Sequence, residues 1–257
     1  MSVYQHFRKD EHAFVDQVME WKETAIEQYR SKLTDFLDPR QQYIVQSLVG
    51  QNDEVAVSFY GGYKEAERKR CLIYPHYVEP VTEDYDIALY ELLYPTKFVQ
   101  IEHREILGAL MNVGLKREKF GDILNSAERF QIVLAKEVAE FVSWNLKSVG
   151  KARVSLQVVP IEESISVTKE YSYLHITASS LRLDTIVAEV YKLSRSKVKP
   201  MIENGYIKVN WKVIEDPSFS LQIKDVLSVR GKGRCEIVSN EGQTKKNKFR
   251  LSVAFPK

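Results

Sequence analysis

Short strand-like segments alternate with two helical segments over residues 55–159, and this order restricts the fold more than any other feature of the sequence. The strand-like segments, which are rich in β-branched and aromatic side chains, are residues 55–60, 70–74, 87–94, 130–135 and 153–159. Helical periodicity covers residues 102–113 and 136–149, and a glycine follows each helix. The pattern predicts an α+β fold whose middle domain is RNA-recognition-motif-like or ferredoxin-like.

The first fifty residues show helical periodicity. Apolar side chains recur at three- and four-residue steps between Phe7 and Tyr29, as on one face of a helix. Asp38 and Pro39 are typical of a helix start, and Gly50 is typical of a helix end. We therefore expect an N-terminal helical segment over residues 1–52 and the α+β domain over residues 53–162.

Basic side chains are concentrated at the C-terminal end. The 257 residues carry 37 Lys and Arg against 35 Asp and Glu, a formal net charge of +2, yet residues 180–257 alone carry a net +8. An acidic body joined to a basic end is typical of a chain in which one domain meets a polyanion, although a solvated basic face has the same composition. We expect a C-terminal domain over residues 180–257, preceded by a linker or hairpin over residues 163–179.

The C-terminal domain is predicted to contain two helices followed by short strands. Helical periodicity covers residues 181–191 and 195–203, with Ser194 as the expected cap of the second helix. Strands are expected at residues 206–210, 226–230 and 235–238, and a basic glycine turn at residues 231–234 joins the last two.

Several of these elements resemble the S4 RNA-binding domain, which is shared by a small-ribosomal-subunit protein, pseudouridine synthases and tyrosyl-tRNA synthetases. The resemblance rests on residues 182–184, 194–195, 202, 205, 209–210 and 228–230. One departure is Lys224 before Asp225, where the family usually has glycine. Because a turn with positive φ fits lysine less well, we expect this corner to differ in shape.

The rest of the chain resembles the YlmH-type proteins of Gram-positive bacteria. The matching motifs are residues 4–8, 33–40, 103–104, 107–110, 114–119 and 121–123. The resemblance implies a non-catalytic protein that binds structured ribosomal RNA, and also tRNA, on the large ribosomal subunit. It further implies a role in the rescue of stalled nascent chains that are still held as peptidyl-tRNA, and a link with cell division.

The second C-terminal helix begins with cations, where helices normally carry acidic side chains. A phosphate would convert the repulsion among Arg195, Lys197 and Lys199 into a binding site, because free backbone N–H groups and the positive end of the helix dipole lie there. The complete predicted RNA-binding set is Arg182, Ser194, Arg195, Lys197, Lys199, Lys208, Asn210, Arg230, Lys232 and Arg234.

A second basic run lies in the middle domain, at Lys116, Arg117 and Lys119. RNA contact and a plain charged loop explain this run equally well. Four tyrosines of the expected sheet are candidates for base stacking, but the aromatic consensus of RNA-recognition motifs is missing, so core packing or partial exposure is the better interpretation. They are Tyr60, Tyr74, Tyr90 and Tyr94.

No catalytic signature accompanies these features. The stretch 182–184 resembles the one that holds the catalytic aspartate of pseudouridine synthases, but here it opens a helix, and we expect Asp184 to pair with Arg182. No phosphate loop, nucleophile elbow or metal-ligand spacing occurs, and Cys71 and Cys235 form no disulfide framework.

We therefore expect a cytoplasmic protein without enzymatic activity, cofactor, metal, small-molecule substrate or membrane segment. Two alternatives stay open. One is an RNA-modifying enzyme of the pseudouridine-synthase kind, and the other is a cell-division adaptor that binds proteins through its acidic N-terminal helices.

Overall fold

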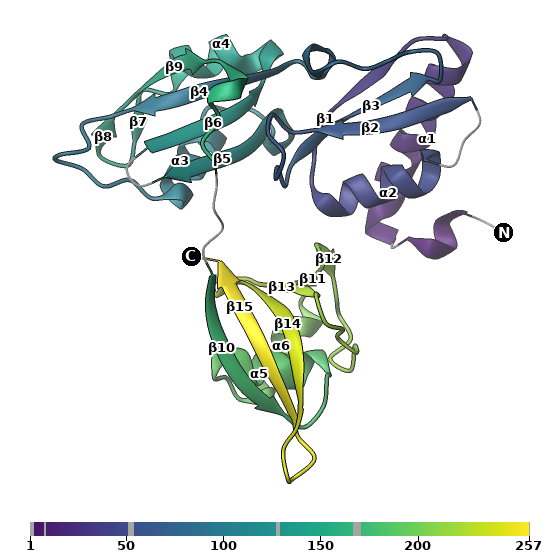
Figure 1. The fold of residues 1–257 in the computed structure, drawn as a ribbon, viewed down its shortest axis with the longest axis vertical. Coiled ribbons are helices and arrows are strands. Elements are labelled where there is room, and N and C mark those ends of the chain that lie inside the picture. The colour runs from purple at the N-terminus through teal and green to yellow at the C-terminus, as the bar shows by residue number, and fades with distance from the viewer. Residues whose placement is uncertain (1–2, 8, 51–53, 127–128, 167–170, 257) are drawn as a thin grey trace. The chain divides into compact units, whose positions relative to one another are not determined.

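The computed structural model describes residues 3–7, 9–50, 54–126, 129–166 and 171–256. The chain divides into two compact units, an N-terminal unit over Met1–Val167 and a C-terminal unit over Thr168–Lys257. Both units combine helices with antiparallel sheets, which confirms the predicted α+β class (Figure 1). No helix in the described ranges is long and apolar enough to cross a membrane.

The first sheet of the N-terminal unit has three antiparallel strands in the order β1-β3-β2. They are β1 (Lys32–Leu37), β2 (Val55–Tyr60) and β3 (Lys69–Pro75). Helices α1 (His12–Glu27) and α2 (Pro39–Val49) pack on this sheet through a core that includes Val18, Val45 and Ile73. The start of α2 is as predicted, because the Asp38 carboxylate accepts the backbone N–H of Gln41 at 2.9 Å.

Strand β1 contradicts the prediction that the first fifty residues are entirely helical. It pairs with β3, for example through Lys32 opposite Ile73, so its partner lies about forty positions away in sequence. Local periodicity cannot show such a partner. The resulting sheet also extends across the expected domain boundary at residue 52.

The second sheet has four antiparallel strands in the order β5-β6-β4-β9. The strands are β4 (Ile87–Leu93), β5 (Phe120–Ser126), β6 (Arg129–Ala135) and β9 (Ser155–Val159), and the helices between them are α3 (His103–Asn112) and α4 (Lys136–Asn145). The chain order β-α-β-β-α-β and this strand order match the RNA-recognition-motif and ferredoxin-like topology, so the predicted fold of the middle domain is confirmed.

Strand β5 was not predicted from the sequence. One local prediction in this domain is wrong. Helix α4 ends at Asn145 rather than at Val149, because a short hairpin of β7 (Ser148–Val149) and β8 (Ala152–Arg153) follows it. Short 3-10 helices complete the N-terminal unit at Val3–His6, Lys9–Glu11, Thr82–Tyr85, Arg117–Lys119 and Ile161–Glu163.

The C-terminal unit is a six-stranded antiparallel sheet in the order β10-β15-β14-β13-β11-β12, with two helices packed on one face (Figure 1). The helices are α5 (Leu183–Tyr191) and α6 (Arg195–Glu203). The strands are β10 (Tyr171–Ala178), β11 (Ile207–Val209), β12 (Lys212–Val213), β13 (Val226–Val229), β14 (Gly233–Gln243) and β15 (Phe249–Pro256).

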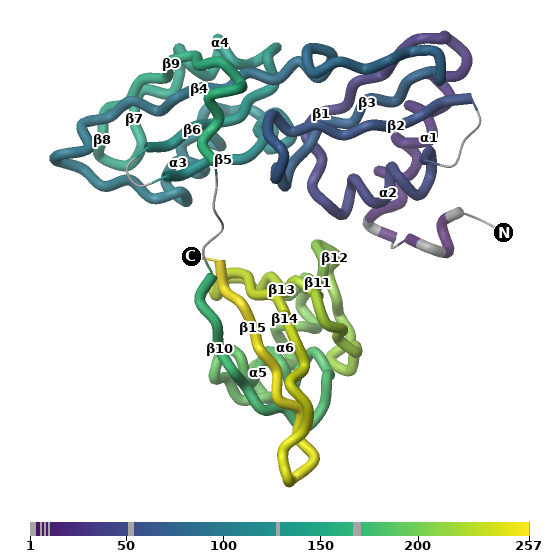
Figure 2. The backbone as a smooth tube through the Cα atoms, in the orientation of Figure 1, coloured from purple at the N-terminus to yellow at the C-terminus, as the bar shows by residue number. Residues whose placement is uncertain are grey.

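The segment expected to be a linker or hairpin contains β10, which is one strand and not a hairpin. It pairs with β15 along its whole length, from Tyr171 opposite Pro256 to Ala178 opposite Phe249. Strand β14 is also longer than the predicted 235–238, and β15 was not predicted. Figure 2 shows β14 and β15 running side by side into the loop that joins them.

Candidate RNA-binding surface

Helix α6 starts at the predicted residue but without the predicted cap. Ser194 occupies the N-cap position with φ −73° and ψ 146°, yet its side chain accepts no backbone N–H of the helix. The Ser194 hydroxyl instead bonds the Ser196 hydroxyl at 2.9 Å. The Lys197 N–H donates to the Ser194 carbonyl at 2.9 Å, so the N–H groups of Arg195 and Ser196 are the ones that this helix start keeps available for an anion. The Lys197 side chain is exposed beside it.

Arg182 and Arg195 are engaged within the protein. Arg182 forms a two-point ion pair with Asp184, at 3.1 and 2.9 Å, and these hydrogen bonds hold the pKa of the Asp184 carboxyl below its usual value. The expected pairing of these two residues is thus observed. The Arg195 guanidinium donates to the hydroxyl groups of the buried Thr185, at 2.9 Å, and of Ser179, at 3.1 Å. Arg195 therefore ties the start of α6 to the start of α5.

The other predicted cations lie on the strands β11, β13 and β14. Lys208 lies opposite Ser228, and Ser228 lies opposite Arg234, so the three form a row across neighbouring strands. Leu227 and Val229, which alternate with Ser228 along β13, are buried in the core with the helices. The row of Lys208, Ser228 and Arg234 therefore occupies the sheet face that points away from α5 and α6.

Two arginines of this face are stacked on aromatic rings that sequence reasoning missed. The Arg230 guanidinium carbon lies 5.1 Å from the centre of the Tyr206 ring, and that of Arg234 lies 5.7 Å from the Trp211 ring. Stacking fixes the plane of a guanidinium, so fewer rotamers are lost when it binds a phosphate. The signal was present in the sequence, since Tyr206, Lys208 and Trp211 interleave aromatic and basic residues.

Asn210 holds a turn together. Its side-chain amide donates to Asp225 at 2.8 Å and its side-chain oxygen accepts the backbone N–H of Val226 at 2.9 Å, while its φ of 48° is left-handed. The neighbouring turn also keeps a positive φ, 74° at Lys224. The lysine thus adopts the conformation that glycine usually supplies, and this φ gives no sign of the altered corner that we expected.

The ten predicted residues fall into two groups. The helix-start group consists of Arg182, Ser194, Arg195, Lys197 and Lys199, and the sheet group consists of Lys208, Arg230, Lys232 and Arg234, with Asn210 in the adjoining turn. Helix α5 lies between them. Thr185 in its first turn bonds Arg195, and the Tyr191 hydroxyl in its last turn donates to the Gly233 carbonyl at 3.4 Å.

The three cations of the basic run in the middle domain differ in their contacts. Arg117 donates to the carbonyl oxygens of Phe120, at 2.6 Å, and Gly121, at 3.3 Å, and burial together with the nearby Arg68 lowers its pKa to about 10. Lys119 binds Asp35 at 2.5 Å and Glu137 at 3.1 Å. The Lys119 contacts join β1 of the first sheet to α4 of the middle domain. Lys116 is exposed.

The sheet face on which RNA-recognition motifs bind RNA is covered here. Leu89 and Val133 on this face pack with Phe36 of β1 and with Ile165, which follows the last strand. Tyr90 packs on the opposite, helix-bearing face, and the Tyr94 ring lies 6.3 Å from the Phe130 ring. Core packing, one of the two interpretations preferred for these tyrosines, is what the structure shows.

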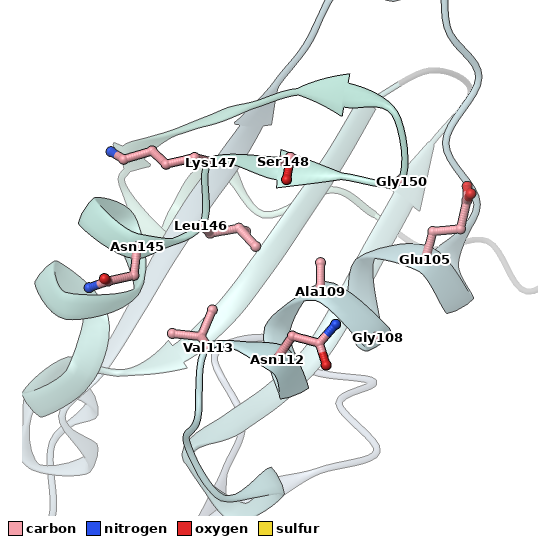
Figure 3. A pocket seen from close by; sticks show the side chains of 10 residues that line it. All are labelled: Glu105, Gly108, Ala109, Asn112, Val113, Asn145, Leu146, Lys147, Ser148 and Gly150. Atoms are coloured by element: carbon pink, nitrogen blue, oxygen red, sulfur yellow. The ribbon is translucent and has the colours of Figure 1, made fainter.

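A cavity of about 610 Å³ opens between α3, the end of α4 and the β7–β8 hairpin (Figure 3). Glu105, the acidic side chain at its rim, is already used, because its carboxylate accepts the backbone N–H of Glu102 at 2.9 Å as part of the α3 cap. The described residues contain no cluster of three or more His, Cys, Asp or Glu side chains that could hold a metal ion.

Comparison with known proteins agrees with this architecture. The family model "YlmH, N-terminal" matches residues 10–78, "Putative RNA-binding domain in YlmH" matches residues 80–163, and "S4 domain" matches residues 181–227. A protein of Bacillus subtilis (strain 168) is 47% identical over 250 residues, which cover 97% of each chain. The chain belongs to the YlmH family. The resemblance drawn from its motifs is confirmed.

The Bacillus subtilis relative carries the name "Ribosome-associated protein quality control protein P2". A solved structure named "Cell division protein ylmH from Streptococcus pneumoniae" is 35% identical, with a TM-score of 0.55, and covers 64% of this chain and all of that one. The small ribosomal subunit protein uS4 of Thermoanaerobacter sp. (strain X514) is 35% identical over 68 residues, 26% of this chain and 33% of uS4.

Proposed function

We propose that this protein is a non-catalytic RNA-binding protein that acts on the large ribosomal subunit in the quality control of stalled nascent chains. Structured ribosomal RNA is its principal ligand, and the tRNA part of peptidyl-tRNA is a second one. The observation that carries the proposal is the S4 domain with exposed, oriented cations, in a chain whose relative at 97% coverage is named for ribosome-associated quality control. The protein would then be located in the cytoplasm.

The cations support RNA as the ligand. Arg230 and Arg234 are pre-oriented on aromatic rings, and Lys208 lies in the same face. Such guanidinium groups bind phosphate oxygens through two parallel hydrogen bonds. The uncapped start of α6 beside Lys197 offers a further anion site.

The states of Asp184, Cys71 and Cys235, three side chains that could act in catalysis, support a non-catalytic role. Both oxygens of Asp184 accept hydrogen bonds from Arg182, and one also accepts from Thr185, at 3.1 Å. Burial raises the pKa of the Cys71 thiol, and burial raises that of Cys235 to about 11. Thiols of this kind are poor nucleophiles at neutral pH. None of these three side chains is therefore a free acid or a reactive thiolate.

Co-sedimentation with purified large ribosomal subunits over a range of salt concentrations tests the proposal. If about five side chains meet phosphates, the logarithm of the binding constant should fall with the logarithm of the salt concentration at a slope of about −3.5 to −4.5. The double variant Arg230→Ala/Arg234→Ala should bind more weakly and with a flatter slope. Its control is Arg30→Ala/Lys64→Ala, which removes two exposed cations of the N-terminal unit outside the matched RNA-binding domain.

Two results would refute the proposal. One is wild-type protein that sediments with the subunits no more than a neutral protein does. The other is a chemically altered nucleotide, detected by mass spectrometry in ribosomal RNA or tRNA after incubation with the purified protein, which would favour the RNA-modifying alternative. A protein partner retained after nuclease treatment, without RNA binding, would favour the adaptor.

A further inference from the structure

The long hairpin of β14 and β15 ends in a basic loop that the predicted RNA-binding set did not include. The loop, residues 244–248, carries Lys245, Lys246 and Lys248, all exposed. Glu241 is the last acidic residue of the sequence, so five basic residues follow it without a counter-charge. The match to the S4 domain ends at residue 227, so this hairpin lies outside it. We call the three lysines the hairpin-tip lysines.

The loop is held in shape by its own hydrogen bonds. The Thr244 hydroxyl oxygen accepts the backbone N–H groups of Lys246, at 3.3 Å, and Lys248, at 3.2 Å. The Thr244 N–H donates to the Lys248 carbonyl at 2.8 Å, and Asn247 adopts the left-handed φ of 54° that closes the turn. A pre-formed loop loses little backbone entropy when it binds a partner.

The hairpin-tip lysines carry uncompensated charge. Within the described part of the chain, none of the three forms an ion pair. The acid nearest in sequence, Glu241, lies 3.3 Å from His175 instead. Three like charges within four residues repel one another, and a polyanion relieves that repulsion.

The position of the hairpin tip relates it to the helix-start group. Phe249, next to Lys248, lies opposite Ala178 at the end of β10, and the next residue, Ser179, accepts a hydrogen bond from Arg195. The loop and the helix-start group therefore lie toward the same end of the sheet. The glycine turn of the sheet group lies at the other end of β14, whose 11 residues span roughly 35 Å.

We propose that the hairpin-tip lysines form a second phosphate-binding site, which contacts the backbone of the same RNA that the S4 domain binds. This inference rests on the proposed function. The loop offers lysines, Thr244 and Asn247 but no apolar or aromatic side chain. It therefore lacks the apolar anchor of a membrane-binding element and the stacking surface of a base-reading one, and phosphate contact is what its chemistry fits.

The test uses the full-length protein with the triple variant Lys245→Ala/Lys246→Ala/Lys248→Ala. Binding is measured by fluorescence anisotropy with a labelled RNA stem–loop and by co-sedimentation with large ribosomal subunits. The control is Lys9→Ala/Arg30→Ala/Lys64→Ala, three exposed basic residues of the N-terminal unit outside the matched RNA-binding domain. A third variant carries arginine at the three tip positions and keeps the charge.

We expect the alanine triple to bind both RNA probes about tenfold or more weakly and with a salt slope flatter by about two to three units. Its melting temperature should be unchanged, because the three exposed lysine side chains form no ion pair within the described part of the chain, and the arginine triple should bind like the wild type. Equal affinity and slope for the alanine triple and the wild type would overturn the site while leaving the proposed function intact. Wild-type protein that binds neither probe would overturn both the hairpin-tip site and the proposed function. Tip-dependent binding to anionic lipid vesicles, without tip-dependent RNA binding, would overturn the assignment to RNA.

Discussion

The side-chain oxygen of Gln131 accepts the backbone N–H of Ile165 at 2.7 Å, and this bond fastens the chain over the sheet face that RNA-recognition motifs leave open. Gln131 is fully buried, and its amide donates to Glu91 and to the carbonyl oxygen of Glu163, both at 3.1 Å. Every polar atom of the side chain therefore has a partner. The covered face is therefore closed to the base stacking that RNA-recognition motifs carry out on it.

Replacing Gln131 with Leu should destabilise the N-terminal unit by about 1–3 kcal/mol, because the Ile165 N–H loses its acceptor inside the protein. Urea denaturation followed by far-UV circular dichroism measures the loss. Gln157→Leu is the control, since Gln157 is exposed on β9 of the same sheet. Equal stability of the two variants would mean that the cover is held by its apolar contacts alone.

Arg195 and Lys197 should respond differently to alanine. Lys197→Ala should weaken RNA binding and leave the melting temperature unchanged, because Lys197 is exposed. Arg195→Ala should also lower stability by about 0.5–1.5 kcal/mol, because the guanidinium bonds the hydroxyl groups of Thr185 and Ser179. Thermal melts and RNA titrations of both variants decide the matter, and Lys192→Ala, at the end of α5, is the control. Identical melts would show that the Arg195 bonds contribute no net stability.

Lys224→Gly should stabilise the C-terminal unit by about 0.5–1 kcal/mol. The φ of 74° at Lys224 is unfavourable by about 1–2 kcal/mol for a residue with a side chain, and glycine removes this strain. Glycine also has a larger conformational entropy in the unfolded state, which offsets part of the stabilisation. Thermal denaturation measures the change. Lys232→Gly is the matched control, since Lys232 is not among the residues with positive φ and should gain nothing. A lower melting temperature for Lys224→Gly would contradict this account.

Glu137 should make the N-terminal unit sensitive to acid. Burial favours the protonated form, but a backbone hydrogen bond, the charge of Arg70 and the Lys119 contact outweigh it and hold the pKa of Glu137 below its usual value. A lowered pKa contributes stability that is complete above the unfolded-state pKa of about 4.3 and is lost as the pH falls through the folded-state pKa.

The variant Glu137→Gln should therefore be less stable than the wild type near neutral pH, and this difference should shrink below about pH 4. Urea titrations between neutral and acid pH measure it, and Glu140→Gln, exposed on the same helix, controls for general charge effects. A difference that does not change with pH would show that the carboxylate charge is not what matters.

The C-terminal unit should fold alone only when β10 is included. A fragment of residues 168–257 should melt cooperatively and bind RNA, whereas the fragment 180–257 should not, because it lacks Ile176 and Ala178 of the core and the whole of β10, one of the two partner strands of β15. Circular dichroism melts of both fragments test this. Cooperative melting of the shorter fragment would show that β10 is dispensable and would favour the boundary expected from the sequence.

The sequence predicted those elements whose signals are local. The capped start of α2 at Asp38 and the start of α6 at Arg195 depend on neighbouring residues, and both were located correctly. Strand β1 was missed because its pairing with β3 is long-range, and the apolar alternation of residues 32–37 is interrupted by Thr34, which is buried, and Asp35.

The residues of the candidate site also include some that local sequence signals revealed and some contacts that they did not. Charge identified the cations, but apart from the pair of Arg182 and Asp184 the sequence did not show which of them have partners within the protein. Arg195 and Arg117 proved to bond the Thr185 hydroxyl and backbone carbonyls, which are contacts that depend on the folded chain. The stacking of Arg230 on Tyr206 required the register of β11 and β13, which spacing alone does not fix.

Ser194, the N-cap residue of α6, bonds Ser196 through its hydroxyl and therefore caps no backbone N–H of the helix. The backbone N–H of Lys197 donates to the Ser194 carbonyl, so the amides without a partner in this turn are those of Arg195 and Ser196, and the free protein should exchange its amide hydrogens fastest there among those of α6. A bound phosphate would complete the turn that the chain itself leaves incomplete. The ligand would then act as the missing cap, and these amides should exchange more slowly in the complex.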